Sequence, residues 1–534
     1  MSDLHTKILE VFASRNLCEL KYKKNIPLPY TMSGIKTASE IIIDAIKLNK
    51  KIAIIGDYDV DGVSSICIME AFFKAINFRN FIIKIPNRFK DGYGVNVKMI
   101  EIYNADIFIT VDNGITAFEV GEYCEKNNKI LIITDHHKPM IKNNDEILPK
   151  ADAIINPKQK KCNFLQKDIC GAVVAWYLCG GIKQKGIESG LWDKNIIDLE
   201  ILTPFLSLAI ISDIMPLTSL NRKLYKMGLE QINTSKNDIF AILRDRFGNK
   251  FKDSTKKLNS QNLAFYVTPL LNSAGRVKNA RLAFKFLSTK NDKMRLKLFE
   301  ILEKTNHIRK QIQNETFLKS QINLVESNNF IFAYDKDLNE GVLGIVAAKL
   351  ADKFNKSAFC FNLKDDVLKG SGRAKNNINL ITSIQNTAGF LSHFGGHSGA
   401  VGLSLKLSDI NDFLNALEKN IVFTPKTAES SEILINLEEI NEEILEILES
   451  YEPYGNGNEM LVFHSKNVAI KKIEKIKEIH QKFYFKNTAK NTIISGILFN
   501  NTDNFKNANI DIKYHIKRDF YKNIELNILE ILRV

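Results

Sequence analysis

Short apolar runs alternate along the chain with stretches whose apolar residues recur every three or four positions. Between residues 51 and 134 the runs KIAIIG, FIIKI, DIFITV and KILIIT alternate with the helix-like segments SSICIMEAFFKAI, VNVKMIEIY and AFEVGEYCEK. Nearly uniform apolar strands separated by helices are typical of a parallel sheet that helices cover on both faces. In such a sheet, ligands bind beyond the carboxyl ends of the strands.

The pattern changes further along the chain. Residues 291–325 contain neither Pro nor Gly and carry apolar residues at helical spacing, which predicts a long helix linking two lobes. A second α/β unit follows, and the final segments IDIKYHIK and IELNILEILRV alternate as in a small antiparallel β domain. We therefore predict an N-terminal extension (1–50), an α/β catalytic domain (51–290), the linking helix (291–325), a smaller α/β domain (326–425) and a small β-barrel domain (426–534).

Composition agrees with several folded domains. The 534 residues exceed what one core usually supports, and 45% of them are hydrophobic. Lys plus Arg number 74 against 61 Asp plus Glu, and this net charge of +13 favours a polyanion such as nucleic acid, although solvated lysines alone would also produce it. Seven cysteines without a CxxC pair argue against a disulfide framework or a zinc ribbon. With no signal-peptide core and no apolar run long enough to span a bilayer, the expected location is cytoplasmic, with no membrane partner.

Acidic and imidazole side chains follow several of the apolar runs. Their positions are Asp57, Asp59 and Asp61 after IAIIG, Asp112 after IFITV, Asp135, His136 and His137 after ILIIT, and Asp213 after LSLAIIS. Each Asp alone could be a turn or helix-cap residue. Their convergence on one sheet edge needs another explanation, because neighbouring carboxylates repel unless a cation lies between them. Oxygen ligands at this density suit Mn²⁺ or Mg²⁺.

The motifs GDYDVDG, VDNG, TDHH and SDIMPL, in this order, resemble those of the DHH phosphoesterase superfamily. The motifs PNRFKDGYG, LNSAGRVKNA, GVLGIVAAKL, LKGSGRA, HFGGHSGAVGL and YEPYGNGN are similar to those of its single-strand-specific exonucleases. The likeness spans roughly residues 50 to 465. It implies a parallel-sheet DHH catalytic domain, a long helix, a smaller α/β DHHA1 domain and a β-barrel domain of the OB type.

The resemblance also implies a set of metal ligands. Two Mn²⁺ or Mg²⁺ ions would be held by Asp57, Asp59, Asp112, His136 and Asp213. Asp61 would lie outside the ligand set or cap the following helix. Asp135 would orient an imidazole or bind an ion directly. His137 would contact the substrate phosphate or orient the attack, so His137 and Asp135 are the expected catalytic pair.

Phosphate-binding residues are implied in the second lobe. In the loop HFGGHSG, Gly395 and Gly396 would let backbone N–H groups approach a phosphate and His397 would donate to it, although the loop could also be a simple turn. In the superfamily this loop faces the metals across a cleft. Arg276, Ser371 and Arg373 resemble a pocket for a terminal 5′ phosphate, where guanidinium suits bidentate contacts. Arg88 is expected along the path of the strand.

The C-terminal domain combines many lysines with aromatic residues. The resemblance favours an OB fold, which binds single strands through a basic groove and stacking on aromatic rings. The aromatic residues concerned are Phe483, Tyr484, Phe485, Phe520 and Tyr521. Because side chains alternate along a strand, every second aromatic should lie in the core and only some should contact DNA.

Two departures from the family pattern appear. Leu338, Asn339 and Glu340 stand where relatives carry an aromatic residue and a His, so a substrate contact through that His is absent. Met460, followed by Leu461, stands where relatives usually carry a Pro at the entry to the last domain. Neither change affects the expected metal ligands.

The function implied is a single-stranded-DNA-specific 5′ to 3′ exonuclease that releases 5′-mononucleotides in DNA recombination and repair. Expected partners are single-stranded DNA, a single-strand-binding protein and a RecQ-type helicase. One alternative is a phosphodiesterase acting on short oligonucleotides or cyclic dinucleotides, and another is a non-catalytic replication scaffold. Ala53 stands where manganese pyrophosphatases of the superfamily carry a His, which argues against that branch.

Overall fold

The computed structural model describes residues 3–15, 17, 26–142, 145–235, 239–250, 256–424, 432–477, 479–487, 492–499, 501, 503, 505, 509–519 and 523–532. The chain divides into two compact units. Unit 1 comprises Met1–Pro86, Gly94–Thr268 and Ala428–Val534, and unit 2 comprises Asn87–Tyr93 and Pro269–Thr427. Within the described part of the chain, no helix is both long and apolar enough to cross a membrane.

A five-stranded parallel sheet forms the centre of unit 1, as the apolar runs predict. Its order is β2-β1-β3-β4-β7, and every neighbouring pair is parallel. The strands are β1 (Ile52–Ile55), β2 (Phe81–Lys84), β3 (Ile107–Val111), β4 (Ile130–Thr134) and β7 (Ala153–Ile155). A two-stranded hairpin, β5 (Met140–Lys142) and β6 (Asp145–Ile147), stands apart from this sheet.

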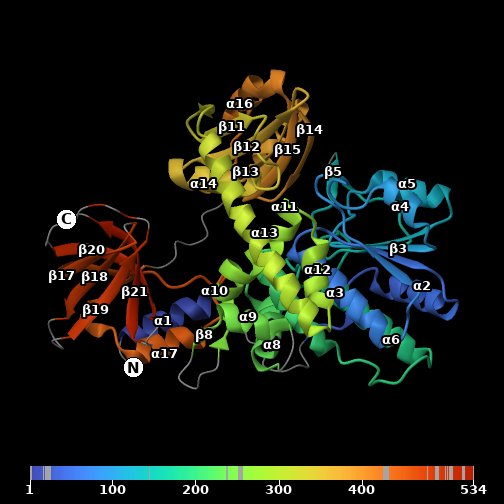
Figure 1. The fold of residues 1–534 in the computed structure, drawn as a ribbon, viewed down its shortest axis with the longest axis horizontal. Helices are drawn as coiled ribbons and strands as arrows, with labels where there is room; N and C mark the ends of the chain where they lie inside the picture. Colours follow the sequence, from blue (N-terminus) through green and yellow to red (C-terminus); the bar gives the residue numbers. More distant parts are fainter. Residues whose placement is uncertain are drawn as a thin grey trace. The chain divides into compact units, whose positions relative to one another are not determined.

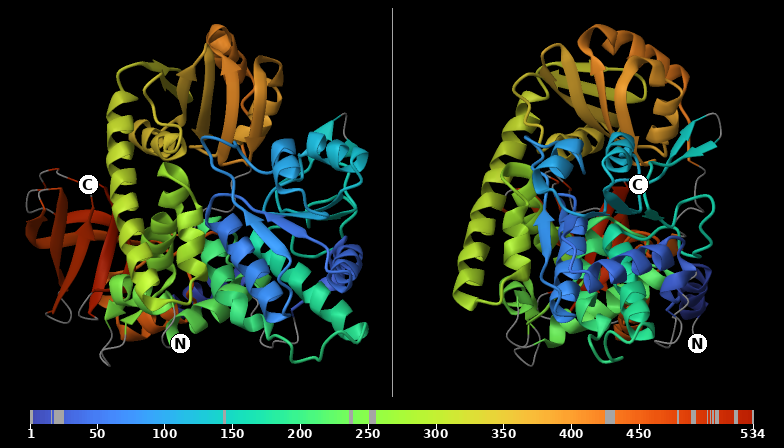
Figure 2. Two further views of the ribbon diagram at one scale, coloured as in Figure 1. Left: turned by 45° about the vertical axis from the view of Figure 1, so that its right-hand side comes forward. Right: turned by 90° about the vertical axis from the view of Figure 1, so that its right-hand side faces the viewer.

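Helices cover both faces of the sheet because alternate strand residues point to opposite sides. Ala53, Phe108 and Leu131 share one buried cluster with residues of α4 (Val97–Tyr103) and α5 (Phe118–Lys126). The helices α2 (Ile35–Lys47), α3 (Val60–Ala75) and α6 (Gly171–Glu188) lie on the other side (Figures 1 and 2). Because all five strands are parallel, their carboxyl ends lie at the same edge of the sheet.

Further helices complete this part of unit 1. They are η2 (Pro29–Thr31), η3 (Leu199–Leu202), α7 (Thr203–Ser212), α8 (Ser219–Thr234), α9 (Ile239–Phe247), α10 (Ser260–Asn262) and the π-helical turn η4 (Leu263–Val267). A short pair of strands, β8 (Asn249–Lys250) and β9 (Lys256–Lys257), lies between α9 and α10 in the chain.

The C-terminal part of unit 1 is a closed β-barrel. Its strands pair in the order β17-β18-β19-β21-β20, and β20 pairs back with β17. The β19–β21 pair is parallel and the other pairs are antiparallel. This five-stranded arrangement is that of an OB fold, as expected. The strands are β17 (Phe463–Ile476), β18 (His480–Asn487), β19 (Thr492–Leu498), β20 (Asn509–Arg518) and β21 (Ile524–Leu532), and β16 (Ile433–Leu434) pairs with β17.

The aromatic residues of β18 alternate as predicted. Phe483 and Phe485 are fully buried in the barrel, whereas Tyr484 between them is half-buried, and its ring lies 5.8 Å from Lys482 Nζ and 6.0 Å from Lys472 Nζ. Phe520 and Tyr521 lie outside the described residues. Of the described aromatics in this set, Tyr484 is thus the one placed to meet a ligand.

The first fifty residues divide between two cores, which the sequence does not reveal. Leu4, Ile8 and Phe12 of α1 (Asp3–Ser14) join the buried cluster of the barrel, and Phe12 stacks on Tyr451 with ring centroids 3.8 Å apart. Helix α2 instead packs against α6 and β7. The N-terminal extension is therefore part of unit 1, while the domain limits drawn from sequence stay predictions.

A buried arginine connects α8 to the segment that precedes the barrel. The Arg222 guanidinium donates hydrogen bonds to the carbonyl oxygens of Tyr451, Glu452 and Pro453 at 2.9, 2.8 and 3.1 Å. Its side chain is buried. The segment itself follows α17 (Glu442–Ser450).

We expect Arg222→Ala to lower the free energy of unfolding by about 3 kcal/mol, since it leaves buried carbonyl groups without their charged donor. Arg222→Lys should recover only part of this loss, because one ammonium cannot reproduce a planar fork with several donors. Urea denaturation followed by circular dichroism measures both variants. An Arg222→Ala protein as stable as the parent would contradict this role.

Unit 2 is built around a six-stranded sheet of order β10-β11-β12-β13-β15-β14, in which only β11 and β12 are parallel. Helix α14 (Leu343–Phe354) covers one face through Val346, Ala347 and Leu350. The remaining elements are α11 (Thr268–Val277), α12 (Arg281–Ser288), α13 (Asp292–Lys319), α15 (Leu380–Gln385), η5 (Ala388–Phe390), η6 (Leu407–Asp409), α16 (Ile410–Lys419), β10 (Leu324–Glu326), β11 (Phe330–Asp335), β12 (Ser357–Lys364), β13 (Val367–Arg373), β14 (Leu391–Gly396) and β15 (Ala400–Lys406).

The predicted long helix is confirmed as α13, with an earlier end. Asn291 caps it by accepting a hydrogen bond from the Met294 N–H, and the helix ends at Lys319 because the chain turns toward β10. The motif HFGGHSG differs from the predicted loop. Its first four residues belong to β14, and only the turn to β15 lies outside the strands.

Candidate metal centre and phosphate-binding residues

The expected acidic residues meet at the carboxyl edge of the parallel sheet. Asp57 follows β1, Asp112 directly follows β3, and Asp135 directly follows β4. Asp59 is the N-cap residue of α3, and its carboxylate accepts a hydrogen bond from the Gly62 N–H at 3.1 Å. Asp213 reaches the same place from a helix, because it is the C-cap residue of α7.

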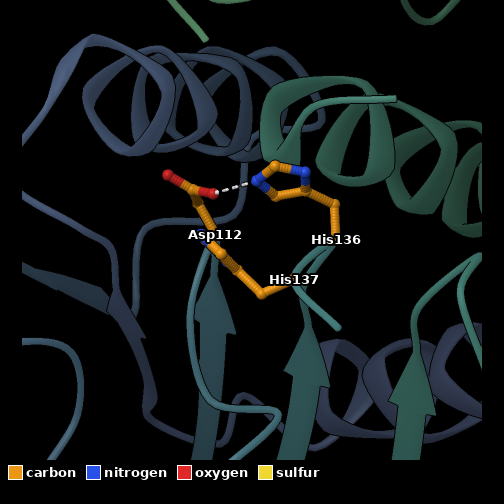
Figure 3. Close-up of side chains that lie close together, drawn as sticks. All are labelled: Asp112, His136 and His137. Atoms are coloured by element: carbon orange, nitrogen blue, oxygen red, sulfur yellow. Dashed lines mark ion pairs between the residues drawn. The ribbon is translucent and has the colours of Figure 1, made fainter. Parts of the chain in front are cut away.

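His136 lies at the centre of this cluster. Its Nε2 atom is 3.2 Å from Asp112 Oδ1, 3.6 Å from Asp61 Oδ2 and 3.6 Å from Asp213 Oδ2. Figure 3 shows the imidazole of His136 turned toward the Asp112 carboxylate above the ends of the strands. Side-chain atoms of Asp57, Asp59 and Asp112 form a second group within 4.8 Å of one another. The five predicted ligands thus surround one small volume.

Asp61 caps a helix, but not the one that follows it in the chain. Its two carboxylate oxygens accept hydrogen bonds from the backbone N–H groups of Gly171 and Ala172, at 2.7 and 2.8 Å. These groups open α6, whose N-terminus carries partial positive charge. The alternative in which Asp61 caps α3 is wrong, because Asp59 has that position. Two such bonds favour a place outside the direct ligands.

Asp135 is engaged by hydrogen bonds on both oxygens. Oδ1 accepts from the backbone N–H groups of His136 and His137 and contacts His137 Nδ1 at 2.7 Å, while Oδ2 accepts from the Ile115 N–H. Burial opposes ionisation, but His137 and these bonds hold the pKa of Asp135 well below its ordinary value. Burial also lowers the pKa of His137, and the Asp135 charge outweighs this and raises it to about 9. Asp135 therefore orients His137.

The cluster is electrostatically costly by itself. Burial, and then the charges of Asp61 and Asp59, raise the pKa of Asp112 well above its ordinary value. Burial and Asp59 raise the pKa of Asp61 to about 6, against the opposing effect of its backbone hydrogen bonds. Asp112 Oδ1 is buried and receives no hydrogen bond from the described residues. Carboxylate oxygens and one imidazole around such an atom suit Mn²⁺ or Mg²⁺, which would offset the repulsion.

Two further residues shape the site, and the sequence analysis did not identify them. The Asn113 side chain donates to the carbonyls of Ile55 and Val111 and accepts from the Val95 N–H, so it ties the ends of two strands together. Gly171 leaves room for Asp112, since a Cβ there would lie 2.5 Å from the Asp112 Cβ. Both follow from close packing, which leaves no spacing signal in the chain.

In unit 2, Arg276 and Arg373 each lie beside the N-terminal end of α14. Arg276 Nη1 donates to the carbonyl oxygen of Gly341 at 3.2 Å. The Arg373 guanidinium lies so close to the helix that a Cβ at Gly344 would be 2.6 Å from Nη2. Arg373 forms no ion pair with any described carboxylate, and burial lowers its pKa. Two guanidinium groups beside a helix N-terminus suit a phosphate.

The other predicted phosphate contacts lie close by within unit 2. Ser371 and Arg373 are two residues apart on β13 and so share a face. Gly402 pairs with Ser371 on one side and with Gly395 on the other, which puts Gly395 in the same row. Gly396 and His397 lead into the turn to β15, where the His397 N–H donates to the Ala400 carbonyl. The segment carrying Arg88 is attached to the same unit, because Asn87 donates to the Lys278 carbonyl.

Known proteins show the same fold and sequence features. The "Single-stranded-DNA-specific exonuclease RecJ" of Haemophilus influenzae is 27% identical over 459 residues, covering 81% of this chain and 78% of that protein. Its namesake in Escherichia coli is 29% identical, covering 76% and 73%. The solved structure of Thermus thermophilus RecJ in complex with Mn²⁺ shares the fold, with a TM-score of 0.75 at 21% identity over 94% of this chain and 72% of that one.

Family models match all three parts of the chain. The DHH family N-terminal domain matches residues 51–203, the DHHA1 domain residues 327–422 and the RecJ OB domain residues 432–531. Fold and site together define a phosphoesterase of the DHH class with an appended OB domain. Within that class, the chain resembles the RecJ exonucleases over most of its length.

Proposed function

We propose that this chain is a metal-dependent, single-stranded-DNA-specific 5′ to 3′ exonuclease that releases 5′-mononucleotides in recombination and repair. The observation that carries the proposal is the position of His136 Nε2, 3.2 to 3.6 Å from three carboxylates at the carboxyl edge of the sheet. The names of the bacterial relatives support the substrate class. The C-terminal OB domain favours this function over cleavage of dinucleotides.

We assign each residue of the centre a role. Asp57, Asp59, Asp112, His136 and Asp213 would hold two Mn²⁺ or Mg²⁺ ions. Bound there, the ions would lower the pKa of a water and stabilise the charge on the leaving oxygen. Asp61 holds the N-terminus of α6 against the site through its backbone bonds. Asp135 holds the imidazole of His137, which we assign to a phosphate oxygen of the substrate.

The polarity rests on the arginines of unit 2. We assign Arg276, Ser371 and Arg373, together with the α14 N-terminus, to the terminal 5′ phosphate. Gly395, Gly396 and His397 would contact a phosphate of the strand, and Arg88 would lie along the path of the strand. A desolvated guanidinium without a carboxylate partner, such as Arg373, gains most from an anionic ligand.

The proposed substrate suggests which proteins act together with this chain. A single-strand-binding protein that covers the DNA and a RecQ-type helicase that supplies single strands are the partners we propose. We also propose a cytoplasmic location, which a DNA substrate supports.

Digestion of a long single-stranded DNA with Mn²⁺, labelled at one end and then at the other, tests the function. Immediate release of 5′-labelled mononucleotide, and slow digestion of the duplex, is the expected result. Release from the 3′ end would overturn the polarity. Equal rates on a dinucleotide and on a long strand would favour the phosphodiesterase alternative.

Arg373→Lys should separate phosphate recognition from chemistry. We expect KM for 5′-phosphorylated single strands to rise about ten-fold, since a charge-assisted bidentate contact is lost. The rate on a 5′-hydroxyl strand should change little. Arg281→Lys, at an exposed arginine of α12, is the matched control and should leave both substrates unaffected. An equal loss on both substrates would show that Arg373 is not a 5′-phosphate ligand.

A further inference from the structure

A cavity lined by aromatic residues lies in unit 1, on elements that contribute no residue to the metal centre. This cavity of about 570 Å³ is bounded by the end of α9 and the turn η4. Phe265 and Tyr266 line it and are 72% and 54% exposed. The Tyr266 ring stacks on Phe247, with centroids 5.9 Å apart and planes inclined by 6°. Two neighbouring exposed rings form a contiguous apolar surface, which is the kind of surface that marks a binding site.

The backbone holds these rings outward. Within η4, Leu263 and Val267 are fully buried, so the residues between them face solvent. Asn233 of α8 donates to the Leu258 carbonyl and accepts from the Leu258 N–H, which fixes the chain before α10. Asn259 and Asn262 then form a reciprocal capping box. A π-helical turn such as η4 frequently marks a functional site.

The polar groups around the cavity suit a nucleotide strand. Arg246, Gln261 and Asn262 line it together with the aromatic rings, and no carboxylate is among its lining residues. Arg244, Lys256 and Lys257 add positive charge in the same stretch of the chain. Between residues 239 and 268, Asp245 is the one described carboxylate, and it pairs with Lys256 at 3.7 Å. A positive surface with exposed ring faces is the combination used to bind single strands by stacking.

We propose that this cavity is a base-stacking subsite for single-stranded DNA, outside the catalytic centre. The proposal rests on the proposed function for its ligand class. One base would stack on Phe265 or Tyr266, and Arg246 would pair with an adjacent phosphate. A volume of this size accepts a nucleobase with its sugar. The subsite would retain the strand between successive cleavage steps and so raise processivity.

Equilibrium binding of the full-length chain to fluorescent oligonucleotides in EDTA, which prevents cleavage, tests the subsite. The probes are dT20 and an abasic 20-mer with the same phosphates. We expect the double variant Phe265→Ala/Tyr266→Ala to bind dT20 about ten-fold more weakly and the abasic probe as the parent does, since only stacking is lost. Arg246→Ala should weaken the binding of both probes. It should also reduce the slope of log affinity against log salt concentration by about one, as expected for one lost phosphate contact.

The controls separate this proposal from other outcomes. Phe423→Ala, at an aromatic residue of unit 2 that is 59% exposed, should leave both affinities unchanged. If the parent chain binds and digests DNA and the double variant binds dT20 equally well, the subsite proposal is wrong and the proposed function is unaffected. A parent chain that neither binds nor digests single strands would overturn the proposed function as well. Equal losses on dT20 and the abasic probe would assign the effect to charge and also overturn stacking.

Discussion

Replacing Asp112 with Ala should lower exonuclease activity with Mn²⁺ by at least about 10³-fold, since the metal centre is expected to supply several kcal/mol of transition-state stabilisation. Asp112 faces His136 Nε2 at 3.2 Å, and one of its oxygens lies within 4.8 Å of ligand atoms from Asp57 and Asp59. The variant therefore loses a carboxylate that belongs to both groups of candidate ligands. Isothermal titration should show fewer Mn²⁺ ions bound per chain, or much weaker binding.

Asp106→Ala is the matched control. Asp106 precedes β3 whereas Asp112 follows it, so the two carboxylates lie at opposite ends of one strand. The Asp106 side chain accepts a hydrogen bond from the Lys51 N–H, away from the cluster. Activity and Mn²⁺ binding should be kept in this variant. A fully active Asp112→Ala protein with a normal melting temperature would contradict the two-metal mechanism.

Gly171→Ala should lower kcat/KM by about 100-fold, through the position of Asp112 alone. The added Cβ would lie 2.5 Å from both the Cβ and Oδ1 of Asp112, a distance at which atoms overlap. The Asp112 carboxylate or the N-terminus of α6 must shift. A shift of α6 would also disturb Asp61, whose carboxylate accepts a hydrogen bond from the Gly171 N–H. Helix propensity by itself favours Ala over Gly, so the clash decides the sign.

The measurement is steady-state cleavage of a labelled single strand together with the apparent Mn²⁺ affinity. Both should be reduced in Gly171→Ala, while circular dichroism shows that the fold is kept. Gly389→Ala is the control glycine, since a Cβ there meets no atom within 4 Å. If Gly171→Ala keeps full activity and metal affinity, Asp112 is not held in place by the contact with α6.

The metal cluster was largely predictable because it depends on local pattern. Apolar runs that end in Asp57, Asp112 and Asp135 specify parallel strands whose carboxyl ends share one edge. The alternation of Phe483, Tyr484 and Phe485 predicted that every second ring enters the barrel core, as Phe483 and Phe485 do. Each of these signals lies within a few residues of the side chain concerned.

Other features depend on contacts between distant parts of the chain. Asp61 could cap either of two helices, and only packing brought the N-terminus of α6, 110 positions away, to its carboxylate. The placement of α1 on the barrel joins residues more than 400 positions apart. Neither partner carries a local mark of the other, because burial depends on complementary shape rather than on spacing.

The sequence by itself therefore determined the chain's strands, its long helix and the residue types at the sheet edge, while the family resemblance indicated the OB barrel. Periodicity and turn chemistry act over a few residues, so one chain segment contains their whole signal. Only the tertiary structure decided which atoms of these residues meet. In the folded chain, Asp135 contacts the His137 imidazole, and Arg373 lies against the N-terminus of α14. The space beside Asp112 is so small that only a glycine fits at position 171. Those are outcomes of close packing, in which a single added methyl group changes the geometry.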